Sequence, residues 1–516
     1  MLDTSIASNQ NINAAEYRDR VLGCWTGKNI GGTLGNPFEG QRTVNDAVFY
    51  SQELNGQPLP NDDLDLQLIW LIAAEEYGLY RLNERILGEF WLTYITGHWN
   101  EYGVCKSNML CGLPPPLSGS CNNDRWKWSN GAWIRSEIWA CLFPGSPDEA
   151  AQLAYCDACC DHAGEGIFAE IFTVTLESMA FVLRDIRALI DFALSRIPGD
   201  GRIARAVRLA CDCYDRSVPF LEARERIVGD SEDLGWFQAP GNLGFVTLAL
   251  LYGEGDFGRT VCLATNCGDD TDCTAGTVGA ILGILHGRKN LPEKWTRPIG
   301  DSIVNCSINT FPQNYQSSLP RTVGELTERV AGLAWRTTRE SLTLPRIEAE
   351  PTAFSAEYVE KLRASTSVSK RLWDRSPYEL TFNLPYGICS VEYEEGPFVK
   401  PGELKKLTFR ISGVRFIEKV VSIKLLPPPE WTTGISNECI VTAKFWNTVA
   451  AELSFIPGDF SGVYYDLPVE IRLGDRRSPT LLLLPLQKGV VVHDTDQVDQ
   501  AFYDRVNRNR SLKLRR

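Results

Sequence analysis

The stretch that most constrains this chain is CLATNCGDDTDCTAGTVGAILGILHG, residues 262–287, because it joins an acidic cluster to an apolar, helix-like run. Gly276, Gly279, Gly283 and Gly287 recur at spacings of three and four, which places small residues along one face of a helix. A face without side chains lets another backbone approach closely. We therefore expect this helix to pack tightly against its neighbours.

A second glycine stripe lies near the start of the chain, in YRDRVLGCWTGKNIGGTLGNPFEG at residues 17–40. Its glycines fall every four residues, again along one helix face: Gly23, Gly27, Gly31 and Gly35. A phosphate-binding loop is the rival interpretation, but no strand pattern precedes the glycines and no Gly-Lys-Ser or Gly-Lys-Thr follows them. Close helix packing is the better account, and Glu39 falls just past the turn that ends this stripe.

Two acidic clusters each precede an apolar, helix-like run. The first is Asn61-Asp62-Asp63-Leu64-Asp65, and the second contains Asp269, Asp270 and Asp272. Acidic residues at a helix start complement its dipole, each by about 0.3–1 kcal/mol, and one would suffice. Clustered carboxylates repel one another, and the chain already has a formal net charge of −13. The alternatives are two capped helices or a divalent-cation site between them, since Mg²⁺ prefers carboxylate and carbonyl oxygens.

Composition excludes several classes of protein. The chain has 516 residues, of which 44% are hydrophobic and 23% charged, so it can form two or three ordinary domains. Its acidity argues against nucleic-acid binding, and no apolar run approaches the length of a membrane span. The first residues have no secretory signal pattern, so we expect a cytoplasmic protein with reduced cysteines.

Three further segments carry residues of chemical interest. Cys156, Cys159, Cys160 and His162 imitate zinc-ligand spacing, but no second cysteine pair completes a four-ligand site, so a structural zinc is disfavoured. Asn130-Gly131 predicts a turn where the backbone can approach a ligand. Arg135 is either a phosphate clamp or the partner of an acid, and the ion pair is the commoner use. Residues 80–130, rich in Trp, Gly and Pro, look like loops laid over a site.

These motifs, in this order, resemble the ADP-ribosylglycohydrolase family, which includes dinitrogenase-reductase-activating glycohydrolases and protein ADP-ribose hydrolases. The resemblance covers about residues 15–340. It is carried by these segments: GCWTGKNIGGTLGNPFEG, NDDLD at 61–65, SNGAWIR at 129–135, the helix of His162, and GDDTDCTAGTVGAILG at 268–283. The chain looks most like the larger bacterial members that have a C-terminal extension.

The resemblance implies an all-α fold with two Mg²⁺ ions, or Mn²⁺ in their place, between the acidic helix starts. The implied metal ligands are Asn61, Asp62, Asp63, Asp270 and Asp272. The implied catalytic residues are Glu39, Asp63 and Asp270. The implied substrate-side residues are Asn130, Gly131 and His162.

The chain departs from the family pattern at four positions. Many members have Thr where this chain has Asn61, and a hydroxyl residue where it has Cys273. The family also often has Asp at the position of Gly32 and Thr at that of Leu64. An asparagine still offers a carbonyl oxygen, but a thiol is a poor ligand for Mg²⁺, so one ion would be held loosely or exchanged for Mn²⁺.

We expect hydrolysis of an N- or O-glycosidic bond to an ADP-ribosyl or related ribosyl unit. Metal ions would orient the sugar hydroxyls, and Glu39 would act as general base or stabilise an oxocarbenium-like transition state. One alternative is a glycosidase or nucleosidase for a sugar without ADP-ribose, since no cluster of Arg or Lys indicates a diphosphate pocket. Another is a catalytically silent, crystallin-like structural protein, which would not need clustered carboxylates.

The C-terminal third changes to a β pattern. We predict an all-α domain at 15–342, a linker with a short helix at 343–377, an immunoglobulin-like antiparallel β-sandwich at 378–490 and a basic tail at 491–516. The sandwich resembles modules appended to bacterial glycosidases. It would bind sugar, pack on the helical domain or mediate a homo-oligomer.

Overall fold

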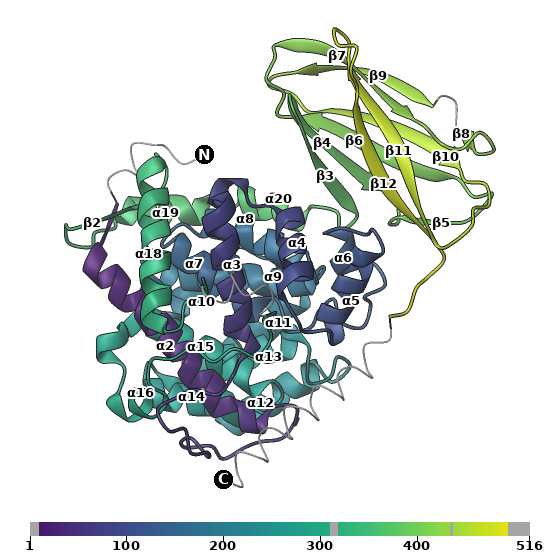
Figure 1. The fold of residues 1–516 in the computed structure, drawn as a ribbon. Coiled ribbons are helices and arrows are strands. Elements are labelled where there is room, and N and C mark those ends of the chain that lie inside the picture. The colour runs from purple at the N-terminus through teal and green to yellow at the C-terminus, as the bar shows by residue number, and fades with distance from the viewer. Residues whose placement is uncertain (1–9, 310–317, 434–436, 494–516) are drawn as a thin grey trace. The chain divides into compact units, whose positions relative to one another are not determined.

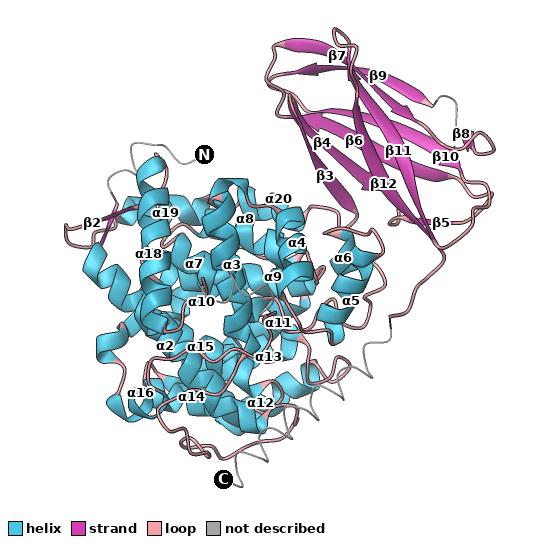
Figure 2. Cartoon of the chain, viewed as in Figure 1, coloured by secondary structure: helices cyan, strands magenta, loops and turns pink. Residues whose placement is uncertain are grey.

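The computed structural model describes residues 10–309, 318–433 and 437–493, which form two compact units. The first contains residues 10–97, 125–158 and 162–374 and is helical. The second contains residues 98–124, 159–161 and 375–493 and consists mainly of strands (Figures 1 and 2). The predicted fold class, a helical region followed by a β-sandwich, is confirmed.

The first unit is built from helices, with one short parallel strand pair, β1 (Asn11–Asn13) and β2 (Arg346–Glu348). The helices up to residue 200 are α2 (Ala14–Gly35), α3 (Asp62–Tyr77), α4 (Glu84–Tyr94), α7 (Glu137–Leu142), α8 (Pro147–Ala158), α9 (Glu165–Ala180) and α10 (Ile186–Leu194). Those that follow are α11 (Arg202–Asp215), α12 (Phe220–Asp230), α13 (Ala239–Gly253), α14 (Phe257–Asn266), α15 (Thr271–His286), α16 (Glu293–Ile299), α18 (Val323–Glu340), α19 (Ala356–Ala364) and α20 (Ser367–Trp373).

The two glycine stripes pack against each other. Helices α2 and α15 run antiparallel, and a Cβ placed on Gly27 would lie 1.9 Å from the carbonyl oxygen of Gly279. A Cβ on Gly23 would lie 2.3 Å from the oxygen of Gly283, one turn further along. No side chain separates the two backbones along this seam, so the expected close packing is confirmed and its partner is identified.

This helix pair places the second acidic cluster at one end of the seam, beside the residues that follow α2. Because the helices are antiparallel, the C-terminal end of α2 lies beside the N-terminal end of α15. The chain after α2 then forms a bridge with the residues before α15: the Gly40 amide donates to the Asp269 oxygen and the Asp269 amide to the Gln41 oxygen, both at 2.9 Å. Glu39 is thereby held next to Asp270.

The second unit contains two five-stranded sheets that share one apolar core. The strand orders are β3-β4-β6-β10-β8 and β5-β12-β11-β7-β9, with antiparallel neighbours except for the parallel pair β5 and β12. The strands are β3 (Glu379–Leu384), β4 (Gly387–Tyr393), β5 (Phe398–Val399), β6 (Lys405–Ser412), β7 (Glu418–Leu425), β8 (Thr432–Thr433), β9 (Glu438–Lys444), β10 (Val449–Ile456), β11 (Tyr464–Leu473) and β12 (Thr480–Lys488). Buried residues alternate along most of them, as expected for a sandwich.

The core of the sandwich is completed by a helical segment from far earlier in the chain. This segment contains α5 (Asn100–Leu110) and α6 (Leu117–Ser120), and its Leu113 and Leu117 are fully buried in the same cluster as the strand residues. Asn122 and Gln487 of β12 also exchange two amide hydrogen bonds, of 2.9 and 3.0 Å. The sandwich is therefore not formed by the C-terminal residues alone.

Leu117→Ala is expected to destabilise the second unit by about 2–5 kcal/mol, because it leaves a cavity in a fully packed core. The matched control is Leu110→Ala at the end of α5, where the side chain is 74% exposed and the expected change is within about 0.5 kcal/mol. Denaturant unfolding of the full chain measures both. Equal effects of the two substitutions would show that the helical segment does not stabilise the sandwich.

The unit boundaries differ from the expected domains. Residues 343–374 belong to the first unit, where they supply β2, α19 and α20, and residues 98–124 and 159–161 belong to the second. The expectation of loops over 80–130 was wrong in part, since α4, α5 and α6 lie there. Most of the predicted basic tail, residues 494–516, lies outside the described residues. Within the described ranges, every helix is too short or too polar to cross a membrane.

Candidate active site

A group of three carboxylates lies where α2 ends and α15 begins. Glu39, Asp270 and Asp272 each offer an oxygen, and these oxygens lie within 4.8 Å of one another. Asp270 and Asp272 are buried, whereas Glu39 is partly exposed. Within the described parts of the chain, Asp270 Oδ1 and Asp272 Oδ1 are buried and accept no hydrogen bond. Such oxygens are costly to bury unless a cation compensates them.

Asp269, the first acid of this motif, pairs with an arginine and not with the other two acids. Its carboxylate pairs with Arg42, with the Nη2 to Oδ2 distance at 3.0 Å, and its backbone has a positive φ of 60°. The left-handed backbone turns the chain so that successive carboxylates diverge. The repulsion inferred for three clustered acids is thus reduced to two facing carboxylates.

Two asparagines hold Asp270 in place. Asn130 Nδ2 donates to Asp270 Oδ2 at 2.7 Å, and Asn130 Oδ1 in turn accepts from Trp133 Nε1 at 3.0 Å. Asn242 Oδ1 accepts from the Asp270 amide at 3.2 Å. Asn130, predicted to bind substrate, is fully buried, and its side chain contacts this acid.

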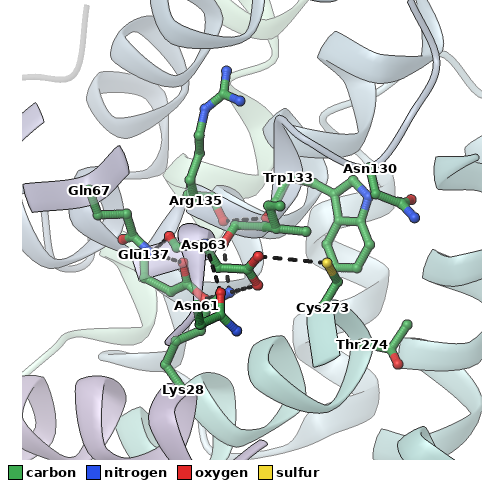
Figure 3. Close-up of polar contacts among 12 residues, drawn as sticks. Lys28, Asn61, Asp63, Gln67, Asn130, Trp133, Arg135, Glu137, Cys273 and Thr274 are labelled. Atoms are coloured by element: carbon green, nitrogen blue, oxygen red, sulfur yellow. Dashed lines mark hydrogen bonds and ion pairs between the residues drawn. The ribbon is translucent and has the colours of Figure 1, made fainter. Parts of the chain in front are cut away.

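A second group contains Asp63, Asp272 and Cys273, so Asp272 is shared between the two groups. Here a lysine is present: Lys28 Nζ lies 3.2 Å from Asp63 Oδ2 and 2.9 Å from Glu137 Oε1 (Figure 3). The Cys273 thiol donates to Asp63 Oδ1 at 3.6 Å. Both oxygens of Asp63 are therefore engaged by groups of the protein.

The other predicted ligands from the first acidic motif, Asn61 and Asp62, lie at the start of α3. Asn61 Oδ1 accepts from the Asp63 amide at 2.7 Å and so caps α3. A Cβ on Gly32 would lie 2.4 Å from Asn61 Nδ2, so the glycine makes room for the amide. The structure does not bring Asp62 into either carboxylate group.

Asp65, at the end of the same motif, fixes a loop. It accepts hydrogen bonds from Asn305 Nδ2 at 2.6 Å and from the amides of Cys306 and Ser307, both at 2.7 Å. Its pKa is raised to about 6 by burial, which these hydrogen bonds oppose. The first acidic motif is thus divided between helix capping, an ion pair and loop support.

The remaining residues selected from the sequence are Gly131, Arg135 and His162. His162 is fully buried, and its Nε2 lies 3.1 Å from the hydroxyl of Ser129. The carbonyl of Gly131 accepts from Arg135, whose Nε pairs with Asp157 at 2.8 Å in a fully buried site. The ion-pair interpretation of Arg135 is confirmed. The cysteines near His162 are not among the groups of described residues placed to hold a metal.

Sequence reasoning missed the residues that support the site: Lys28, Glu137, Gln67 and Asn242. Gln67 Nε2 donates to Glu137 Oε2 at 2.8 Å, and Gln67 Oε1 accepts from the Ile138 amide at 2.8 Å. Lys28 offered a signal, since a lysine within a stripe of small residues predicts a buried cation near an acid. Glu137, Gln67 and Asn242 lie in ordinary helical sequence and offered none.

Burial dominates the electrostatics of both groups. It raises the pKa of Asp270 well above its usual range, and the carboxylates of Asp272 and Glu39 raise it further. Burial also raises the pKa of Asp63, where Lys28 opposes the effect and Asp272 adds to it. Burial alone lowers the pKa of Lys28, but the carboxylates of Glu137 and Asp63 raise it by more, so this lysine is charged. Each group thus carries an electrostatic cost that a cation relieves.

The metal-free chain is expected to lose stability as the pH rises. The pKa of Asp65 is about 6 in the folded chain against an ordinary 3.8, so the folded state binds more protons between these values. The free energy of unfolding therefore falls as the pH rises through this window, by about 3 kcal/mol from this group. Asp270, whose pKa is also raised, adds to the loss.

Thermal unfolding of chelator-treated protein, from about pH 4 to about pH 8, measures this effect. Mg²⁺ should raise the melting temperature most at the upper end, because ionised carboxylates bind the ion and folded protein is stabilised by linkage. A melting temperature that rises with pH in the absence of metal would contradict the assignment of buried carboxyl groups.

The two groups differ in their fit to Mg²⁺. Glu39, Asp270 and Asp272 offer only oxygen ligands, and two of the oxygens are buried without a hydrogen bond among the described residues. This donor set suits a hard divalent cation. The group of Asp63 includes a thiol and an adjacent ammonium, which do not suit one.

The comparisons with known proteins agree with this architecture. The sequence model of the ADP-ribosylglycohydrolase family matches residues 13–332, more than half of the 516-residue chain. The matched residues include the group of Glu39, Asp270 and Asp272. The chain belongs to the ADP-ribosylglycohydrolase family, and this membership supports a hydrolase rather than an inert structural protein. No curated protein matches the chain.

Proposed function

We propose that the chain is a divalent-cation-dependent hydrolase that cleaves the N- or O-glycosidic bond between an ADP-ribosyl unit and its acceptor. The observation that supports this is the group of Glu39, Asp270 and Asp272, in a chain whose family acts on ADP-ribosylated substrates. The ion is Mg²⁺, for which Mn²⁺ can substitute because it accepts the same oxygen ligands.

The roles of the residues follow from their burial and partners. When bound, the ion would orient the sugar hydroxyls and polarise a water or the leaving group. Asp270 and Asp272 hold it, and Asn130 keeps Asp270 in one orientation through its 2.7 Å hydrogen bond. Asn130 is therefore a positioning residue.

Glu39 is the member of the group that is partly exposed, so it can contact both water and substrate. As a carboxylate it can accept a proton from the attacking water or stabilise positive charge on the sugar ring. Asp63 has both oxygens engaged, by Lys28 and Cys273, and in this proposal it takes no part in proton transfer.

The test is to incubate the Mg²⁺-loaded chain with N-linked and O-linked ADP-ribosyl model compounds and to measure the release of ADP-ribose by chromatography. We expect release from at least one linkage, a loss of about 10²–10⁴-fold in Glu39→Gln, and no release in Asp270→Ala. Calorimetric titration with ADP-ribose, against ribose and AMP, measures product binding separately. Metal-loaded protein that neither binds ADP-ribose nor releases it would refute the proposal.

A second candidate is a glycosidase or nucleosidase whose sugar carries no diphosphate. Three cations near the site are each held by a carboxylate: Lys28 by Asp63 and Glu137, Arg42 by Asp269, and Arg135 by Asp157. Because the chain is also strongly acidic, a diphosphate would depend on the ion and on backbone N–H groups. Binding of ribose but not of ADP-ribose would favour this candidate.

We further propose that the chain acts in the cytoplasm. All sixteen cysteines are free thiols, and eleven of them are buried. Reduced cysteines in this number are typical of a reducing compartment. Fractionation of cells that express the full chain with a C-terminal tag would test this.

A further inference from the structure

The site contains a cation of its own. Lys28 lies on α2 and faces α15, with its side chain 1% exposed. Its ammonium pairs with Asp63 and Glu137 (Figure 3). It also donates to the carbonyl of Ile134 at 2.6 Å. An ammonium has three N–H donors, and the Lys28 ammonium has three oxygen neighbours, so each donor has one oxygen to face.

The glycine stripe of α15 makes room for this lysine. A Cβ on Gly276 would lie 3.3 Å from Lys28 Cδ, so a larger residue would press on the lysine stem. Burying a lysine is costly unless it is paired, and here both carboxylates that pair with it are themselves buried. Lys28 is therefore a buried, ion-paired part of the site.

The ligands that a second metal ion would need are already in use. Asp63 Oδ2 faces Lys28, and Asp63 Oδ1 accepts from the Cys273 thiol. The side-chain oxygen of Asn61 caps α3 by accepting from the Asp63 amide. Asp62 belongs to neither of the two groups of residues that could hold a metal ion. On the α3 side, both oxygens of Asp63 and the side-chain oxygen of Asn61 therefore already have partners within the protein.

The group on the other side has the opposite character. Asp270 Oδ1 and Asp272 Oδ1 are buried and, in the described residues, receive no hydrogen bond. Their neighbour Glu39 adds a third carboxylate within 4.8 Å. One half of the site is thus compensated by the protein, and the other half requires a cation from solution.

We propose that the ammonium of Lys28 takes the place of a second metal ion, so that the chain binds one divalent cation, at Glu39, Asp270 and Asp272, and not two. This inference rests on the metal-dependent function proposed above and narrows it. Asp272 belongs to both groups, so it lies between Asp63, the carboxylate that pairs with Lys28, and the residues that would hold the metal ion.

The test is to count Mn²⁺ ions on the full, chelator-treated chain by electron paramagnetic resonance. We expect one ion per chain, with the spectrum of an isolated Mn²⁺, and none in Asp270→Ala. Two ions per chain, or the spectrum of an exchange-coupled pair, would overturn the inference while leaving metal-dependent hydrolysis intact. No bound ion would overturn both. One bound ion without turnover of any ribosyl substrate would support the inference and refute the proposed function.

Lys28→Met tests the role of the lysine itself. Removing the ammonium leaves Asp63 and Glu137 without their cation, so we expect a second Mn²⁺ to bind and the count to double. The control is Lys289→Met on the exposed surface, which should still bind one ion. A folded Lys28→Met chain that binds a single ion would overturn the assignment. If this variant does not fold, the count on the unaltered chain decides the question.

Discussion

Gly27→Ala is expected to prevent the first unit from folding. The added Cβ would lie 1.9 Å from the carbonyl oxygen of Gly279, and the atom it meets belongs to the backbone of a packed helix. A side chain could rotate away from such a clash, but a backbone carbonyl inside a helix cannot. Ordinary overpacking costs about 1–3 kcal/mol, and separating the whole helix seam should cost more.

Soluble yield and far-ultraviolet circular dichroism measure the effect of this substitution. The matched control is Gly332→Ala in α18, where a Cβ would have no heavy atom within 4 Å. That substitution should stabilise the chain by about 0.5–1 kcal/mol, because alanine restricts the unfolded chain and favours the helix. A Gly27→Ala chain that folds with unchanged stability would mean that α2 and α15 do not pack backbone to backbone.

Asp272→Ala is expected to abolish both metal binding and turnover. Asp272 is the residue shared by the two groups, so its loss removes a ligand and also one of the charges around Asp63. Substituting a residue that only supports a metal ligand costs about 10–100-fold in metal affinity, so loss of a direct ligand should exceed about 100-fold. Calorimetric titration with Mn²⁺ and an assay of ADP-ribose release measure the two effects.

Asp269→Asn is the matched control for this prediction, three residues earlier in the same motif. Its carboxylate pairs with Arg42 and belongs to neither metal group, so the variant should lose stability and keep its metal affinity. Equal loss of metal binding in both variants would show that the motif acts through its overall charge. Retained affinity in Asp272→Ala would remove this residue from the site.

Much of the fold followed from local patterns in the sequence. Each glycine stripe predicted a helix able to pack closely, because a helix face of small residues lets another backbone approach. The alternation of apolar residues after Tyr378 predicted the sandwich. The pairing of α2 with α15 could not be predicted, because both stripes would fit any closely packed neighbour.

The site was predicted by its acids but not by their partners. Asp270 and Asp272 were selected as clustered carboxylates, and the structure brings them together with Glu39. Asn61 was selected by its place in a motif, and in the structure its side-chain oxygen caps α3. A motif gives the kinds of ligand available, but which oxygens remain unpaired depends on residues such as Lys28 and Asn242 that other elements supply.

The helical segment in the core of the sandwich has a consequence for synthesis of the chain. Leu113 and Leu117 leave the ribosome long before β3–β12, and at about 5–20 residues per second they wait on the order of tens of seconds for their strands. During that time their apolar side chains lack the cover that the finished unit gives them. A nascent chain that stops before these strands are made keeps Leu113 and Leu117 uncovered, so chaperones and proteases can recognise it.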